Sequence, residues 1–265
     1  MSGTASVWPG TASSAAAFTF DFDAEEVWLA EDPRNVNRPG VLSQGTYGAK
    51  VAIPQLLDLL GRHSIRATFF VPGRVAERYR EQVAAIVAAG HELAHHGYTH
   101  TPPASLSRDE EELELIRGQQ ALEVFGTEVS GYRAPSWDIS SNTLSLLQEQ
   151  GFRYSSNLMD DIRPYRHEGS ALVELPVHWT LDDAAHFWFA EASWTKGIAT
   201  TGAVRSVWEE EFLGIRKMGG ASIFTMHPQV IGRPSRLAFL DEFTAFVTSH
   251  DDVWIATAGE IASKF

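Results

Sequence analysis

The chain has 265 residues, of which 44% are hydrophobic and 21% are charged, so it can bury a core and wholesale disorder is excluded. Its 21 basic and 34 acidic side chains give a formal net charge of −13. Nucleic acids and anionic membranes bind basic faces, so neither is expected as a partner. The chain contains no cysteine, so a metal would have to be held by histidine, aspartate or glutamate.

The N-terminal segment has the composition of a loose arm. Ser, Thr, Gly and Ala dominate the first sixteen residues, which contain no apolar run of secretory-signal length. No stretch approaches the ~18 consecutive apolar residues of a membrane span. We therefore predict a flexible arm over residues 1–16, one domain over residues 17–265 and a cytoplasmic location. A chain that had lost its leader would show the same pattern.

Short apolar runs alternate with amphipathic helical segments along the chain. The predicted strands cover residues 17–23, 66–71, 91–94, 131–134, 152–155, 171–176, 222–227 and 253–257. Between them lie helix signals, such as Ser107 with Glu110 at capping-box spacing. This alternation predicts a single α/β domain with a parallel sheet, either closed or doubly wound.

One segment, residues 28–48, shows no helical or strand period and is rich in glycine and proline. Irregular segments of this length are uncommon in compact domains and often act as lids. We predict a functional lid here, with a plain surface excursion as the alternative.

The first predicted strand carries two carboxylates on one face. Phe18, Phe20 and Phe22 alternate with polar residues, so Asp21 and Asp23 point to the opposite face, about 7 Å apart at Cα. Because unpaired charges are costly to bury, that face is expected to hold a metal, bases or water. A helix-capping pair and an Asp-x-Asp phosphatase site are the alternatives.

Four of the ten histidines lie within residues 91–100. His91 and His95 are four apart, as are His96 and His100, a spacing that places both imidazoles on one side of a helical turn. His91 begins a strand-like run, whereas the second pair follows the strand and can curl together. With the nearby carboxylates, the second pair predicts a two-histidine, one-carboxylate metal site. Core packing is the alternative for the first pair.

Five motifs in order resemble those of the polysaccharide deacetylase family (NodB homology, carbohydrate esterase 4). They are residues 19–23, 96–100, 133–137, 154–161 and 224–228. The resemblance spans nearly the whole chain and implies a distorted (β/α) barrel of about seven parallel strands, with the site at their carboxyl ends. Phe22 between the two aspartates and Gly97 after the first histidine are more similar to the branch with the Helicobacter-type peptidoglycan deacetylase homologue, cyclic imide hydrolases and allantoinase-like proteins.

The resemblance implies catalytic roles for the matched residues. The metal, one divalent ion, would be zinc in the first place and Co²⁺, Ni²⁺ or Mn²⁺ otherwise, and its ligands would be Asp23, His96 and His100. Asp21 would be the general base, paired with Arg133, and His227 the general acid.

Four further residues are expected on the substrate side: Trp137, Tyr98, Asp160 and Asp161. Either aspartate could instead orient His227 or cap a turn, and Trp137 could be ordinary packing. The aromatic-rich segment at residues 178–186 is also expected near the substrate.

The predicted activity is metal-dependent hydrolysis of non-peptide carbon–nitrogen bonds. It would remove N-acetyl groups from amino sugars or open small cyclic amides. The alternatives are a cyclic imide hydrolase or allantoinase-like enzyme without sugar activity, and a non-catalytic carbohydrate-binding barrel. The resemblance also implies a homo-oligomer, with a tetramer as the candidate assembly.

Overall fold

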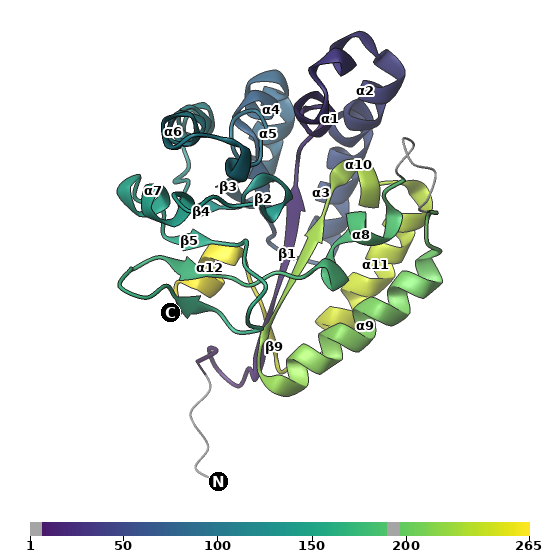
Figure 1. The fold of residues 1–265 in the computed structure, drawn as a ribbon. Coiled ribbons are helices and arrows are strands. Elements are labelled where there is room, and N and C mark those ends of the chain that lie inside the picture. The colour runs from purple at the N-terminus through teal and green to yellow at the C-terminus, as the bar shows by residue number, and fades with distance from the viewer. Residues whose placement is uncertain (1–6, 190–196) are drawn as a thin grey trace.

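The computed structural model describes residues 7–189 and 197–265, in which a curved sheet forms the centre of the fold (Figure 1). Its strands lie in the order β6 (Tyr165–Arg166), β7 (Val173–Glu174), β5 (Tyr154–Ser155), β4 (Gly131–Tyr132), β3 (Glu92–His95), β2 (Thr68–Val71), β1 (Ser14–Asp21) and β8 (Ala221–Met226). β9 (Val253–Ile255) pairs with the start of β1, and β2 pairs with its end, so these two strands share one edge of β1. The strands pair in parallel except for β6, which is antiparallel to β7.

The two sides of the curved sheet approach each other. An isolated parallel bridge joins Asp182 to Thr225, and the amide of Ala221 donates to the carbonyl of Ile162 at 2.9 Å. The predicted distorted (β/α) barrel is confirmed, and each of the eight predicted strands overlaps an observed one. β6 is absent from the predicted set because its residues, Tyr165 and Arg166, are not buried and do not belong to an apolar run.

Helices surround this sheet, and Figure 1 shows α9 and α11 side by side on one flank, with α4, α5 and α6 on the other. The α-helices are α1 (Glu26–Glu31), α2 (Pro39–Tyr47), α3 (Ile53–Arg62), α4 (Gly73–Arg78), α5 (Arg80–Ala88), α6 (Arg108–Glu123), α7 (Thr143–Glu149), α8 (Asp183–Phe187), α9 (Thr201–Met218), α10 (Pro228–Ile231), α11 (Pro234–Thr248) and α12 (Ala258–Ala262). Short 3-10 helices are η1 (Pro33–Asn37), η3 (Pro103–Ser105), η4 (Pro135–Trp137) and η5 (Trp179–Leu181), and η2 (Gly48–Ala52) is a π-helix. The predicted capping box at the start of α6 is confirmed. Among the described residues, no helix is both long and apolar enough to cross a bilayer.

Residues 28–48 are helical, so the predicted irregular loop is wrong. The segment runs through α1, η1 and α2, and continues into η2. A Cβ on Gly45 would lie 2.3 Å from the carbonyl carbon of Ala24, and one on Gly48 would lie 3.0 Å from the amide nitrogen of Gln229. These glycines, which have low helix propensity, allow the close packing that holds the segment helical. Tertiary contact therefore decides a structure that local sequence does not predict.

The predicted end of the arm at residue 16 is also wrong. Trp8 is buried, its ring lies edge-on to Phe265 at 5.6 Å, and β1 already begins at Ser14. Burial of the large apolar ring of Trp8 offsets part of the entropy that the small residues around it lose by becoming ordered. The folded part therefore begins before residue 17, and residues 1–6 of the predicted arm lie outside the described residues.

The alternation along β1 is as predicted. Phe18, Phe20 and Phe22 are buried on one face, where Phe18 packs on Phe224 at 5.2 Å and Phe20 stacks on Phe69 at 4.9 Å. The opposite face carries the polar residues. Packed aromatic rings on one side thus hold the carboxylates of the other side in place.

We expect acidification to destabilise the fold in part through His91. Burial lowers the pKa of His91 from 6.5 to about 4. Below pH 6.5 the unfolded chain therefore binds a proton that the folded chain does not bind until about pH 4. The free energy of unfolding should fall through this window by at most about 1.4 kcal/mol per pH unit from this residue. Urea unfolding between pH 6.5 and 4 measures this. In His91→Gln the free energy of unfolding should fall less steeply with decreasing pH than in the wild type, and an equally steep fall would contradict the role of His91.

Candidate active site

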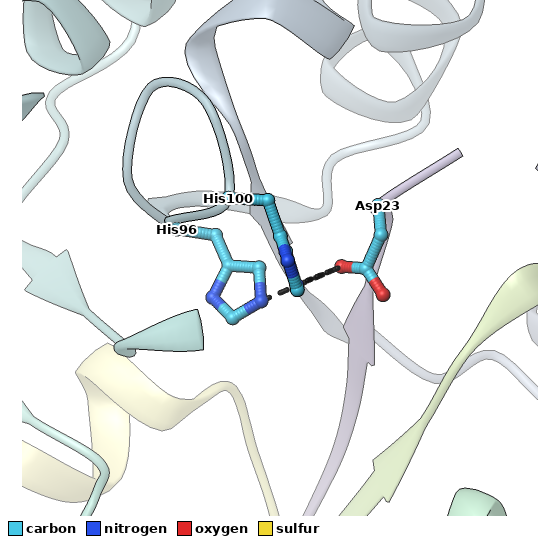
Figure 2. Close-up of side chains that lie close together, drawn as sticks. All are labelled: Asp23, His96 and His100. Atoms are coloured by element: carbon cyan, nitrogen blue, oxygen red, sulfur yellow. Dashed lines mark ion pairs between the residues drawn. The ribbon is translucent and has the colours of Figure 1, made fainter. Parts of the chain in front are cut away.

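Three side chains converge at the carboxyl ends of β1 and β3, the two strands that flank β2. Asp23 follows β1 by two residues, His96 directly follows β3, and His100 lies one turn further along the same loop. In Figure 2 both imidazoles point toward the carboxylate of Asp23. Its Oδ1 lies 3.4 Å from Nε2 of His96 and 3.6 Å from Nε2 of His100. The predicted trio is therefore assembled from two separated stretches of chain.

These donors fit a divalent metal ion. Oδ1 of Asp23 is buried and accepts no hydrogen bond from the described residues. Nδ1 of His96 donates to the carbonyl of Arg133 at 2.8 Å, which leaves the Nε2 lone pair facing Asp23. Burial lowers the pKa of His100 to about 4, so this imidazole is neutral near pH 7 and can act as a ligand. One carboxylate and two imidazoles within 4.8 Å of one another form a possible metal site.

Helix α6 holds the loop that carries both histidines. Oε2 of Glu114 accepts the amides of Tyr98 at 2.9 Å and Thr99 at 2.8 Å, and Oε1 accepts the Thr99 hydroxyl at 3.0 Å. Gly118 lets the helix approach, since a Cβ there would lie 2.2 Å from Nε2 of His95. His95 is thus a packing residue, as its alternative interpretation allowed. The Glu114 carboxylate of α6 thus holds the loop in place.

Replacing Glu114 with alanine should weaken zinc binding by about 10- to 100-fold, because the loop that presents His96 and His100 loses its acceptor. Glu114→Gln keeps one carbonyl oxygen for both amides and should lose less. Competition with a chromophoric chelator measures the affinity, and circular dichroism checks the fold. Glu112→Ala on the same helix is the control. Equal losses in Glu112→Ala and Glu114→Ala would refute this positioning role.

Asp21 is paired with Arg133, as predicted. Oδ1 of Asp21 accepts from the guanidinium at 2.7 Å. The fully buried Arg133 also donates to the hydroxyls of Thr19 at 2.8 Å and Ser156 at 3.0 Å, and it stacks over Phe70. These contacts fix the orientation of the carboxylate. Oδ2 of Asp21 lies 4.0 Å from Nε2 of His96, beside the metal-ligand trio.

His227 also lies beside the trio and is held by Asp183. Oδ1 of Asp183 accepts from Nδ1 of His227 at 2.7 Å, and Oδ2 accepts the His227 amide at 3.0 Å. Burial alone would lower the pKa of His227, but the carboxylate of Asp183, assisted by Asp182 and Asp23, raises it well above its ordinary value. His227 is therefore a proton donor near neutral pH, and its Nε2 is 3.9 Å from Oδ2 of Asp23.

A small pocket of about 160 Å³ connects these groups. Its walls include Trp137, Trp179 and Trp188. The rings of Trp137 and Trp179 are 4.4 Å apart, and Trp188 lies edge-on to His227 at 6.3 Å and stacks on Trp28 of α1. Trp137 thus lies where it was predicted. The pocket is narrow, and its walls are largely aromatic.

The backbone around this pocket departs from ordinary geometry. Four residues other than glycine have left-handed φ values close to the site: Ala24 at 46°, His100 at 58°, Ser136 at 58° and Trp137 at 56°. Such conformations cost roughly 1–3 kcal/mol each and persist only where the surroundings hold them. Their concentration here is typical of a site whose geometry serves chemistry.

Three predicted substrate residues lie elsewhere. Tyr98 is buried between α4 and α6, with its hydroxyl on Glu77 and the Arg117 guanidinium over its ring. Asp160 accepts from the hydroxyl of Tyr165, and Asp161 caps a turn through the amides of residues 162 and 163. None of the three lines the pocket. The motif match gives their position along the chain but not the direction of their side chains, and the turn-capping alternative holds for Asp161.

The sequence did not predict a role for several residues of the site. Asp183 orients His227 in place of Asp160 or Asp161, and Gln229 donates to Oδ2 of Asp23 at 3.3 Å. Asp182 caps α8 and lines the pocket, where burial raises its pKa to about 7. For Asp182 and Asp183, the only indication in the sequence is that they belong to the aromatic-rich segment expected near the substrate. His178 and His186 of that segment bond to Thr180 and do not line the pocket.

Comparisons with known proteins agree with this geometry. The family model for polysaccharide deacetylases matches residues 45–155. The peptidoglycan deacetylase of Helicobacter pylori is 30% identical over 279 residues, which cover 94% of this chain and 95% of that protein. A Mycobacterium smegmatis structure classed as a polysaccharide deacetylase is 42% identical, with a TM-score of 0.93 over 99% of this chain and 94% of the other.

The structure of Puue allantoinase superimposes with a TM-score of 0.85 over 99% of this chain and 94% of the other. At 22% identity it shows a shared fold alone. The fold and these similarities define a hydrolase of the NodB-type (β/α)-barrel class. The similarity to the Helicobacter protein over nearly the full length of both chains shows that this chain belongs to the polysaccharide deacetylase family.

Proposed function

We propose that this protein is a metal-dependent amide hydrolase that removes N-acetyl groups from amino sugars. One observation carries the proposal: Asp21 and His227, each held by a partner of opposite charge, both lie within 4.0 Å of a member of the Asp23–His96–His100 trio. A base and an acid separated by a metal site are the parts that hydrolysis of an unactivated amide requires. The similarity to the Helicobacter deacetylase supports the acetylated sugar as substrate.

The chain would divide the proton transfers between two residues. Asp21, aimed by Arg133, takes a proton from water as the water oxygen attacks the amide carbon. His227 gives its proton to the departing nitrogen as the carbon–nitrogen bond breaks, and the products are a carboxylic acid and an amine. A divalent metal held by Asp23, His96 and His100 would supply Lewis acidity at the carbonyl oxygen and make the attacking water more acidic.

The pocket supports a small acyl group at the reacting centre. Its volume is only about 160 Å³. A space of this size suits an acetamido group lying against the tryptophans of its wall, while the rest of a sugar would extend beyond it. Stacking of sugar rings on exposed aromatic faces such as Trp179 would hold that part.

The proposal is tested by measuring acetate release from N-acetylglucosamine oligomers by the zinc-loaded protein. Asp21→Asn should lower the rate by about 10² to 10⁴ while the metal content stays at one per chain. Phe18→Leu, on the opposite face of β1, is the control. Absence of acetate release by a protein that carries its metal would overturn the assigned substrate.

A second candidate is hydrolysis of small cyclic amides without sugar activity. The narrow pocket favours it, because a five- or six-membered ring is small enough to lie against the tryptophans of its wall. The two candidate functions are distinguished by assaying ring opening of succinimide and dihydrouracil, which is measured as a loss of ultraviolet absorbance. Turnover of the rings with no acetate release would assign this activity instead.

A further inference from the structure

The active-site pocket contains a further carboxylate whose chemistry the proposed hydrolysis does not use. Asp182 lies directly before α8 and lines the pocket together with Asp21 and His227. A parallel bridge between Asp182 and Thr225 holds its backbone beside the end of β8. The proposed proton transfers use Asp21 and His227 and leave Asp182 without a role.

Only one oxygen of Asp182 serves the fold. Its Oδ1 accepts the amides of Ala184 at 2.6 Å and Ala185 at 3.3 Å in the first turn of α8. Its Oδ2 accepts no hydrogen bond from the residues that the structure describes, and unlike Oδ1 of Asp23 it is not sealed from solvent. Serine or asparagine would cap the helix equally well, so the second oxygen exceeds what capping requires.

This second oxygen needs a donor when the pocket is filled. Arg133 pairs with Asp21, whereas no arginine or lysine in the described ranges forms an ion pair with Asp182. The charge of His227 only partly opposes the burial that raises the pKa of Asp182 to about 7. A substrate in this narrow pocket displaces water, so Oδ2 loses its donors unless the substrate supplies one.

Asp182 also lies close to the proposed proton donor. One of its carboxylate oxygens is within 4.8 Å of a ring nitrogen of His227. An atom that hydrogen-bonds to two partners at about 3 Å each, at a tetrahedral angle, holds these partners about 5 Å apart. The nitrogen of a secondary amide becomes such an atom once its carbonyl carbon is attacked, because it then carries one hydrogen and one free lone pair. The lone pair would face His227, and the hydrogen would face Asp182.

We propose that Asp182 is a specificity-determining residue that accepts the N–H of the scissile amide. The inference rests on the proposed hydrolysis and adds to it the class of nitrogen that the site takes. Substrates whose reacting nitrogen carries a hydrogen, such as acetamido sugars and cyclic imides, provide a donor for Oδ2. Fully substituted amides place carbon against the carboxylate and leave it unpaired in a filled pocket, so they are rejected.

Two chromogenic amides test the inference with the zinc-loaded protein at pH 8, where Asp182 is ionised. p-Nitroacetanilide has the N–H, and N-methyl-p-nitroacetanilide lacks it. Both need His227 as the acid, so the ratio of their kcat/KM values cancels any effect of a variant on His227. Asp182→Asn keeps an oxygen for the cap of α8 but presents an amide group in place of Oδ2. The ratio should therefore fall at least about tenfold in this variant.

Two further variants separate recognition of the N–H from a structural role. Asp182→Ser retains a capping hydroxyl but has no second oxygen, and it should lower the ratio as well. Asp251→Asn, at an exposed aspartate, is the control and should leave the ratio unchanged. Circular dichroism checks the fold. Where turnover is slow, competitive inhibition of p-nitrophenyl acetate hydrolysis by each amide gives the same comparison.

The outcomes distinguish this inference from the proposed function. Equal reaction of the two amides in the wild type, or an unchanged ratio in both Asp182 variants, would overturn the inference. An unchanged ratio with slower hydrolysis of N-acetylglucosamine oligomers would instead place Asp182 on a sugar hydroxyl, which also overturns it. Acetate release from those oligomers by the wild type, measured in parallel, tests the proposed function by itself.

Discussion

Alanine at Asp23, His96 or His100 should remove the bound metal and the hydrolytic activity together. Each replacement deletes one of three protein ligands, and a structural or catalytic zinc needs at least three. Because a metal supplies several kcal/mol of transition-state stabilisation and about 1.4 kcal/mol is tenfold in rate, we expect the activity to fall at least about 10³-fold. Elemental analysis measures the metal, and acetate release measures the activity.

The matched control is His63→Ala. His63 is a histidine on the outer surface that pairs with Asp241 at 2.6 Å, and it lies outside the pocket. Its loss should leave one metal per chain. If all three ligand variants also kept one metal per chain, the trio would not be the metal site. If they lost the metal but kept full activity, the reaction would not depend on the metal.

Replacing Asp183 with asparagine should shift the pH dependence of hydrolysis. The carboxylate of Asp183 outweighs burial and raises the pKa of His227. A general acid must be protonated, so the rate falls as the pH rises through the pKa of His227. Without the carboxylate that pKa drops, and the alkaline limb of kcat/KM should move to lower pH. The loss should increase with pH and reach at least about 100-fold near pH 8.

Asp160→Asn separates the observed arrangement from the predicted one. Asp160 bonds to Tyr165 outside the pocket, so its replacement should leave the pH profile unchanged. His227→Gln should lower the rate across the whole range, because it removes the proton donor itself. A pH profile of Asp183→Asn identical to that of the wild type would refute the role of Asp183 in holding His227 protonated.

The barrel and most of its reacting groups could be predicted because their causes are local. The period-two pattern of β1 requires Asp21 and Asp23 to share a face, and packing of Phe20 on Phe69 maintains it. His96 and His100 lie in one short loop that follows a strand. Groups that follow the carboxyl ends of parallel strands meet at one edge of the sheet, and only β2 separates β1 from β3, so these residues converge.

The misplaced residues depend on contacts between distant segments. Asp183 and His227 are 44 residues apart in sequence. They meet because the chain segment after β7 forms a bridge to β8. Tyr98 lies within the motif loop, yet α6 draws its ring under Arg117 and away from the pocket. No spacing within the sequence encodes either direction.

The sequence by itself determined the parallel α/β architecture and the faces of its first strand, since propensity and periodicity act over a few neighbouring residues. Its motifs also supplied the candidates for the metal ligands and for the base. Only the tertiary structure decided that residues 28–48 are helical, that Asp183 holds His227 and that three tryptophans form the pocket wall. These features arise from packing across the fold. Close packing at Gly45 outweighs the low helix propensity of that residue, and buried charges such as Asp183 require a partner wherever the fold supplies one.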